Sequence, residues 1–309
     1  MSVPYSAERP AKSASQVRAG RRTWLLVFVL GLVLWLLTVA ATFATGNANL
    51  LPTLVFLGSF LVPVTFVTWA FDHSGPHSAV SARVLLAAFL VGGTLGVLGA
   101  SVLETYFLHP SVWMYVGVGL IEEGVKLAAL WLVALNMPRY TRRDGLILGA
   151  AVGFGFAALE SSGYALTALV TVHGLSLADL VQTEVLRGLL SPFGHGLWTA
   201  ILGGVLFATA GRTGRPRVTG GLLGAYVGVS VLHALWDSMH GIAVMLTLRL
   251  TSDPLGGGLL RYGYLPRPSE GQVQLFFALQ IAGWIVITAI ALGWLFSMAR
   301  RPEPRSAEG

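Results

Sequence analysis

Long apolar segments separated by short polar or basic connections recur along almost the whole chain. A run of about 18 or more mainly apolar residues is long enough to cross a bilayer as an α-helix. The pattern therefore predicts an all-α, polytopic membrane bundle of about eight transmembrane helices. The expected spans are 24–44, 49–71, 83–106, 112–136, 146–171, 191–210, 219–247 and 273–298.

The composition agrees with a membrane protein. Hydrophobic residues make up 54% of the chain and charged residues 11%, against roughly 25% charged in an ordinary soluble domain. The net charge of +6 does not indicate a nucleic-acid partner, because the basic residues lie in loops and tails, where they orient the helices. The chain has no cysteine, which excludes disulfides and thiolate metal ligands.

The basic residues also predict the orientation of the helices. Fifteen of the 20 lie in the two tails and in alternate loops, whereas four lie in the other loops. The positive-inside rule then places both the N- and C-termini in the cytoplasm. We expect residues 1–22 to be a disordered cytoplasmic tail, 23–299 the integral membrane domain, and 300–309 a second cytoplasmic tail. The excess of arginine over lysine suggests a bacterial protein of the plasma membrane.

Ionisable residues interrupt four of the expected spans, although a charge at the bilayer centre costs roughly 2.5–3.5 kcal/mol on insertion scales. This cost predicts a functional site within residues 112–247. The residues are Glu122, Glu123 and Lys126 in the fourth span, Glu160 in the fifth, His195 in the sixth, and His233 and Asp237 in the seventh.

Spacing and depth predict that these side chains meet. Glu122 and Lys126, like His233 and Asp237, are four residues apart and share a helix face. At 1.5 Å rise per residue, the acidic residues of the fourth and fifth spans lie roughly 15 Å from the outer ends of their helices. The site is therefore expected in the outer half of the membrane. Glycines at 149, 153, 155, 221, 224 and 228 predict close helix packing beside it.

Simpler interpretations exist for single residues. Glu122 and Lys126 alone would make a buried ion pair that fixes helix register. Glu104 lies near the end of a span, where it would meet water, and Trp198 and Trp236 would be packing aromatics. The outward segments 172–190 and 248–272 are expected to be connectors rather than ordered lids.

Taken together, the motifs resemble the PrsW family of intramembrane proteases, within the larger group of CAAX prenyl proteases and bacteriocin-processing enzymes. Glu122-Glu123-x-x-Lys126 matches the first motif, Phe156-x-x-x-Glu160 the second, His195 the third and His233-x-x-x-Asp237 the fourth. The prenyl-protease branch has arginine after the doublet and histidine in the second motif, so Lys126 and Glu160 favour the PrsW branch.

The resemblance implies peptide-bond hydrolysis in single-span or otherwise membrane-anchored protein substrates, near the extracytoplasmic side. In the family's best-known role the substrate is an anti-sigma factor, whose cleavage begins regulated proteolysis. Either Glu122 or Glu123 is expected to be the general base.

The cofactor is left open between zinc and none. His195 and His233, with Glu160, would supply three zinc ligands, or the imidazoles would donate to the oxyanion. Asp237 would orient an imidazole or act as a ligand. The H-E-x-x-H signature is absent, but the family's naming as metalloproteases favours zinc.

A proton-coupled transporter or channel using buried Glu and His residues is the alternative function. It is disfavoured because the polar groups lie at one depth and no inverted repeat is evident.

Overall fold

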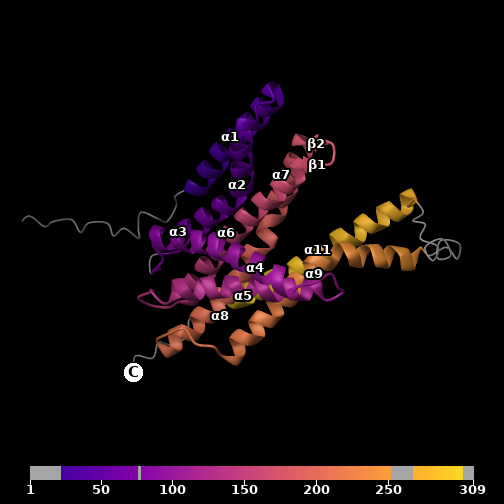
Figure 1. The fold of residues 1–309 in the computed structure, drawn as a ribbon. Coiled ribbons are helices and arrows are strands. Elements are labelled where there is room, and N and C mark those ends of the chain that lie inside the picture. The colour runs from indigo at the N-terminus through magenta and orange to yellow at the C-terminus, as the bar shows by residue number, and fades with distance from the viewer. Residues whose placement is uncertain (1–21, 76–77, 252–266, 302–309) are drawn as a thin grey trace, which may run out of the picture.

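The computed structural model describes residues 22–75, 78–251 and 267–301, and these are almost entirely helical (Figure 1). The only sheet among them is a hairpin of two-residue strands, so the predicted all-α class is confirmed. The elements in chain order are α1 (Thr23–Thr45), η1 (Ala48–Leu50), α2 (Leu51–Asp72), α3 (Ala82–Val91), η2 (Gly92–Gly96), α4 (Val97–Phe107), α5 (Met114–Ala134), α6 (Arg142–Leu169), β1 (Val170–Thr171), β2 (Gly174–Leu175), α7 (Leu177–Leu190), η3 (Ser191–Phe193), α8 (His195–Thr213), α9 (Gly220–Leu250) and α11 (Glu270–Ala299).

Seven helical segments in the described residues are long and apolar enough to cross a membrane. They are α1, η1 with α2, α3 through α4, α6, α7 through α8, α9 and α11. The remaining expected span corresponds to α5, which has 21 residues but contains Glu122, Glu123 and Lys126. The bulk of both predicted tails and of the 248–272 connection lies outside the described residues.

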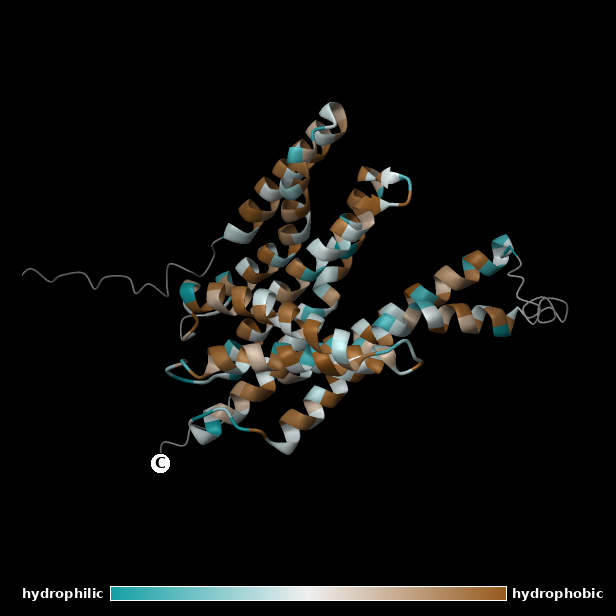
Figure 2. Ribbon diagram, in the orientation of Figure 1, coloured by the Kyte–Doolittle hydropathy of each residue, from teal (hydrophilic) through white to brown (hydrophobic). Residues whose placement is uncertain are grey.

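The helices differ sharply in how much of their apolar surface other helices cover. In α6, 72% of the apolar stretch is buried, against 6% in α1 and 11% in α11. Figure 1 shows α1 beside α2 as one projecting arm and α9 beside α11 as another. Many residues of these arms are hydrophobic (Figure 2), and large apolar side chains on them are exposed, among them Leu37 and Phe43 of α1 and Phe277 and Ile281 of α11, which suits helices that face lipid. The centre of the bundle is therefore α6 with α8.

Glycines on one face of α6 let α8 come so close that the backbones of the two helices are in contact. A Cβ at Gly149 would overlap the carbonyl oxygen of Thr199, and one at Gly153 would overlap that of His195. Small residues four apart are the usual means of such contact between membrane helices. On α9 the expectation holds only at Gly228, where a Cβ would lie 3.0 Å from the Trp294 ring of α11, whereas a Cβ at Gly224 would meet nothing within 4 Å. Gly119 of α5 instead lies against the Ser230 carbonyl of α9.

The segment 172–190 is an ordered helix rather than the expected connector. After the hairpin, Ser176 caps α7 by accepting a hydrogen bond from the Asp179 N–H at 3.3 Å, which is a common helix-initiating pattern. Glu184 of α7 is buried and accepts a 2.8 Å hydrogen bond from the indole N–H of Trp35 in α1. This hydrogen bond between a buried acid and a residue far away in the sequence links α7 to α1.

The contact between α6 and α8 leads to a stability prediction. Gly149→Ala should lower the free energy of unfolding by about 1–3 kcal/mol, because the added methyl overlaps a backbone that cannot move independently of its helix. Gly163→Ala on the same helix is the matched control, since a Cβ there meets nothing within 4 Å. Thermal unfolding of the two purified variants in detergent compares them. Equal melting temperatures would contradict the tight α6–α8 contact.

Candidate active site

The seven ionisable residues singled out in the sequence lie together in the structure, within hydrogen-bond or ion-pair distance of other members of the set. Four helices supply them. The residues are Glu122, Glu123 and Lys126 on α5, Glu160 on α6, His195 at the start of α8, and His233 and Asp237 on α9. The backbone contact at Gly153 sets the position of the first turn of α8, and so of His195.

Lys126 is the central cation of this cluster. Its Nζ lies 2.6 Å from Glu123 Oε1 and 3.3 Å from Glu122 Oε2, and its side chain is fully buried. The same ammonium lies 2.8 Å from His195 Nδ1 and 4.3 Å from the ring centroid of Phe156. The ion pair between Glu122 and Lys126 is therefore present. Because the same ammonium also contacts His195, it links Glu122 and Glu123 to α8 and does more than fix the register of one helix.

Each histidine contacts a carboxylate through one ring nitrogen and faces Glu122 with the other. Because an ammonium only donates hydrogen bonds, His195 Nδ1 accepts from Lys126 and its Nε2–H donates to Glu160 Oε2 at 3.1 Å. The Nδ1 of His233 lies 3.0 Å from Glu123 Oε1. Its Nε2 lies 3.6 Å from Glu122 Oε2 and 3.3 Å from Asp237 Oδ2.

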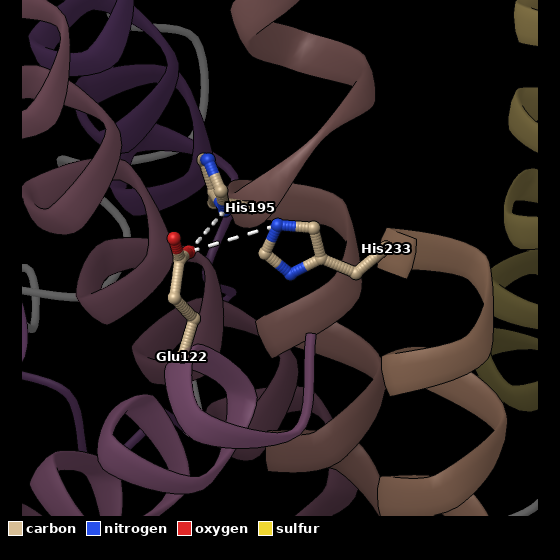
Figure 3. A group of neighbouring side chains, drawn as sticks. All are labelled: Glu122, His195 and His233. Carbon is tan, nitrogen blue, oxygen red and sulfur yellow. Dashed lines mark ion pairs between the residues drawn. The ribbon is translucent and has the colours of Figure 1, made fainter. Parts of the chain in front are cut away.

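Glu122, His195 and His233 form a group that could hold a metal ion, with one ligand atom from each residue all within 4.8 Å of one another (Figure 3). Two imidazoles and a carboxylate are a known donor set for catalytic zinc. Glu160 was expected as the third ligand, but it contacts the Nε2 of His195, on the other side of the ring from Glu122. Carboxylates bound to the outer ring nitrogens, as here, typically orient metal-binding histidines.

A cavity of about 580 Å³ opens beside this group and is walled by α4 through α9. Glu122, Glu160, His195 and Asp237 line it. Glu123, Lys126 and His233 lie behind the wall and are 0–1% exposed. The two glutamates of the doublet therefore have different environments, although they are adjacent in sequence.

Arg187 of α7 is a cavity residue that sequence reasoning assigned to an outer loop. Its guanidinium donates to Glu160 Oε2 at 2.5 Å and to Ser161 Oγ at 2.8 Å, and it lies 4.1 Å from the centroid of the Tyr164 ring. The Ser176 cap predicts a helix that includes Arg187, but nothing in the sequence places that helix beside Glu160.

A multi-pass bundle with carboxylates and imidazoles gathered around one cavity is typical of an intramembrane hydrolase. Residues 80–254 match the family described as PrsW family intramembrane metalloprotease. The chain belongs to the PrsW family. It is a peptidase and a multi-pass bacterial membrane protein.

Two relatives carry the name Protease PrsW. The one from Halalkalibacterium halodurans is 27% identical over 173 residues, covering 54% of this chain and 74% of that protein. The one from Shouchella clausii is 28% identical over 120 residues, covering 38% of this chain and 51% of that protein. No solved structure matches the chain.

Removing the central cation should destabilise the bundle. Lys126→Met leaves two buried carboxylates without their ammonium and should cost about 3–5 kcal/mol of unfolding free energy. Adding Glu123→Gln should recover part of that loss, because one of the two unpaired charges is then absent. Chemical denaturation in detergent measures both variants. If the Lys126→Met variant were as stable as the parent protein, Lys126 would not be the residue that holds the cluster together.

Proposed function

We propose that Glu122 activates water to hydrolyse a peptide bond in a segment bound in the cavity. The observation that carries this assignment is that Glu122 lines the cavity while its Oε2 faces both His195 and His233. Glu123 is fully buried and tied to Lys126 and His233, which suits a residue that positions the imidazole of His233. The ionisable groups form one cluster rather than a row across the membrane, which favours hydrolysis over proton-coupled transport.

The proposed substrate is a single-span or otherwise membrane-anchored protein, with an anti-sigma factor as the first candidate. A volume of about 580 Å³ accommodates a few residues of extended chain, so the peptide bond would be presented in an unwound segment. The distribution of basic residues favours cytoplasmic termini, and the depth of the acidic residues in their helices then favours a cavity nearer the outer surface. Cleavage would accordingly take place near the extracytoplasmic side.

We assign the proton transfers to the carboxylate oxygen of Glu122 that makes no ion-pair contact. Its ion-pair contacts use Oε2, which leaves Oε1 to accept a proton from water as that water attacks the carbonyl carbon. The same oxygen then returns the proton to the leaving nitrogen. A hydrogen-bond donor on the cavity wall, the guanidinium of Arg187, is assigned to stabilise the oxyanion.

We assign zinc as the ion that this site takes, held by Glu122, His195 and His233. When bound, zinc polarises a carbonyl oxygen and acidifies water. Glu160 and Glu123 hold the two imidazoles with their remaining nitrogens turned inward. The Lys126 ammonium contacts Glu122 Oε2 and His195 Nδ1, so it would have to move away from these atoms if they were to hold the ion.

The base assignment gives an activity prediction. Glu122→Gln should reduce cleavage of a co-expressed single-span reporter by about 10²–10⁴-fold, the usual contribution of a positioned general base. Asp179→Asn, an exposed carboxylate on α7 outside the cavity, should cleave normally. Immunoblots of the released reporter domain and of the membrane-inserted enzyme provide the readout. Full activity of Glu122→Gln with normal insertion would refute the assignment.

The zinc assignment predicts about one zinc ion per chain in protein purified without chelators. His195→Ala and His233→Ala should each lose most of it, because two remaining ligands bind zinc weakly. Elemental analysis of the purified proteins measures occupancy independently of activity. Protein that lacks stoichiometric metal and is fully active in chelator would instead establish the metal-free reaction.

A further inference from the structure

Glu104 lies in the wall of the catalytic cavity, although its sequence position near the end of a span suggested contact with bulk water. The lining residues of α4 are Val97, Ala100, Ser101 and Glu104. Their spacing of three, one and three residues places them on a single helix face. The small side chains of Ala100 and Ser101 leave space in the cavity one helical turn before the carboxylate of Glu104.

The preceding π-turn, η2, fixes this face against the helix that carries Glu160. A Cβ at Gly92 would overlap the backbone of Val152, and one at Gly93 would be 2.9 Å from the carbonyl oxygen of Gly155. π-turns often occur at functional sites because they change which residues face a neighbouring helix. The packing of η2 therefore helps to set the position of α4, the helix that carries Glu104.

Glu104 also differs from the other acids of the cavity wall in lacking a counter-charge. Glu122 pairs with Lys126, Glu160 with Arg187, and Asp237 with His233. In the part of the chain that the structure describes, Glu104 has no ion pair, and its Oε1 is buried without a hydrogen-bond donor. A buried acceptor left unsatisfied is costly, so a donor supplied by a ligand would be bound favourably.

We propose that Glu104 forms a subsite for a lysine or arginine side chain of the substrate, close to the peptide bond that is cut. This inference rests on the proposed proteolytic function and specifies its selectivity. Two further polar atoms of the cavity residues lack partners, Ser191 Oγ and Trp198 Nε1. Both donate hydrogen bonds and so suit carbonyl oxygens of the substrate main chain. Glu104 only accepts when ionised, and an extended peptide offers its strongest donors on basic side chains.

The test uses the purified full-length enzyme in detergent micelles with a mixture of single-span peptides randomised at individual juxtamembrane positions. Mass spectrometry of the products gives the residue preference at each position around the cut. The wild type should favour Lys and Arg at one position by about tenfold or more over neutral residues. Glu104→Gln should remove that preference while still cutting peptides with neutral residues there, and Glu104→Lys should shift it to Asp and Glu. Asp179→Asn is the matched control and should keep the wild-type profile.

The outcomes separate the two proposals. Cleavage without a basic preference, or a basic preference that survives in both Glu104 variants, would overturn the subsite while leaving the protease intact. Cleavage that is unaffected by Glu122→Gln would instead overturn the proposed catalytic function. A preference lost equally in Asp179→Asn would assign the effect to overall charge and also reject the subsite. Matching melting temperatures of the Glu104 variants and the parent establish that the proteins compared are folded.

Discussion

The contact of the Lys126 ammonium with Glu122, Glu123 and His195 is the interaction on which the remaining site geometry depends. In a water-poor interior, charges of opposite sign attract strongly, and any charge left alone is heavily penalised. One lysine makes it possible to bury two adjacent carboxylates. Because the same ammonium reaches His195, α5 and α8 are held in a single relative register. The histidine can then present a defined nitrogen to Glu122.

Close backbone packing supplies the rigidity that electrostatics alone would not give. The glycine face of α6 brings α8 near enough for main-chain contact, with Gly153 against the carbonyl of His195. Gly119 performs the same function between α5 and α9. Both histidines thus stand on helices whose separation is set by van der Waals contact, which varies little. A site that must hold imidazoles within a few tenths of an ångström needs such support.

The sequence allowed the helical class and the seven clustered residues to be predicted, since charges inside apolar runs are informative one helix at a time. Four-residue spacing placed Glu122 with Lys126 and His233 with Asp237 on shared helix faces. The estimated depth of each residue in its span predicted that residues on different helices lie at the same level. The sequence did not predict that Arg187 and Glu104 line the cavity, because their positions depend on how neighbouring helices pack against one another. Arg187 reaches Glu160 only because α7 folds back over the bundle, and Glu104 faces the cavity on a helix that follows the π-turn at 92–96. The difference between Glu122 and Glu123 likewise required knowing which one the cavity reaches.

The hydrogen bond between Trp35 and Glu184 links a helix outside the residues that match the family to one inside them. The match begins at residue 80, whereas Trp35 belongs to α1, the first helix among the described residues, and carries no chemistry. It nevertheless anchors α7, and α7 delivers Arg187 to Glu160 one turn further on. Through this one hydrogen bond, a helix with no chemistry of its own helps to set where the guanidinium of Arg187 stands in the cavity wall.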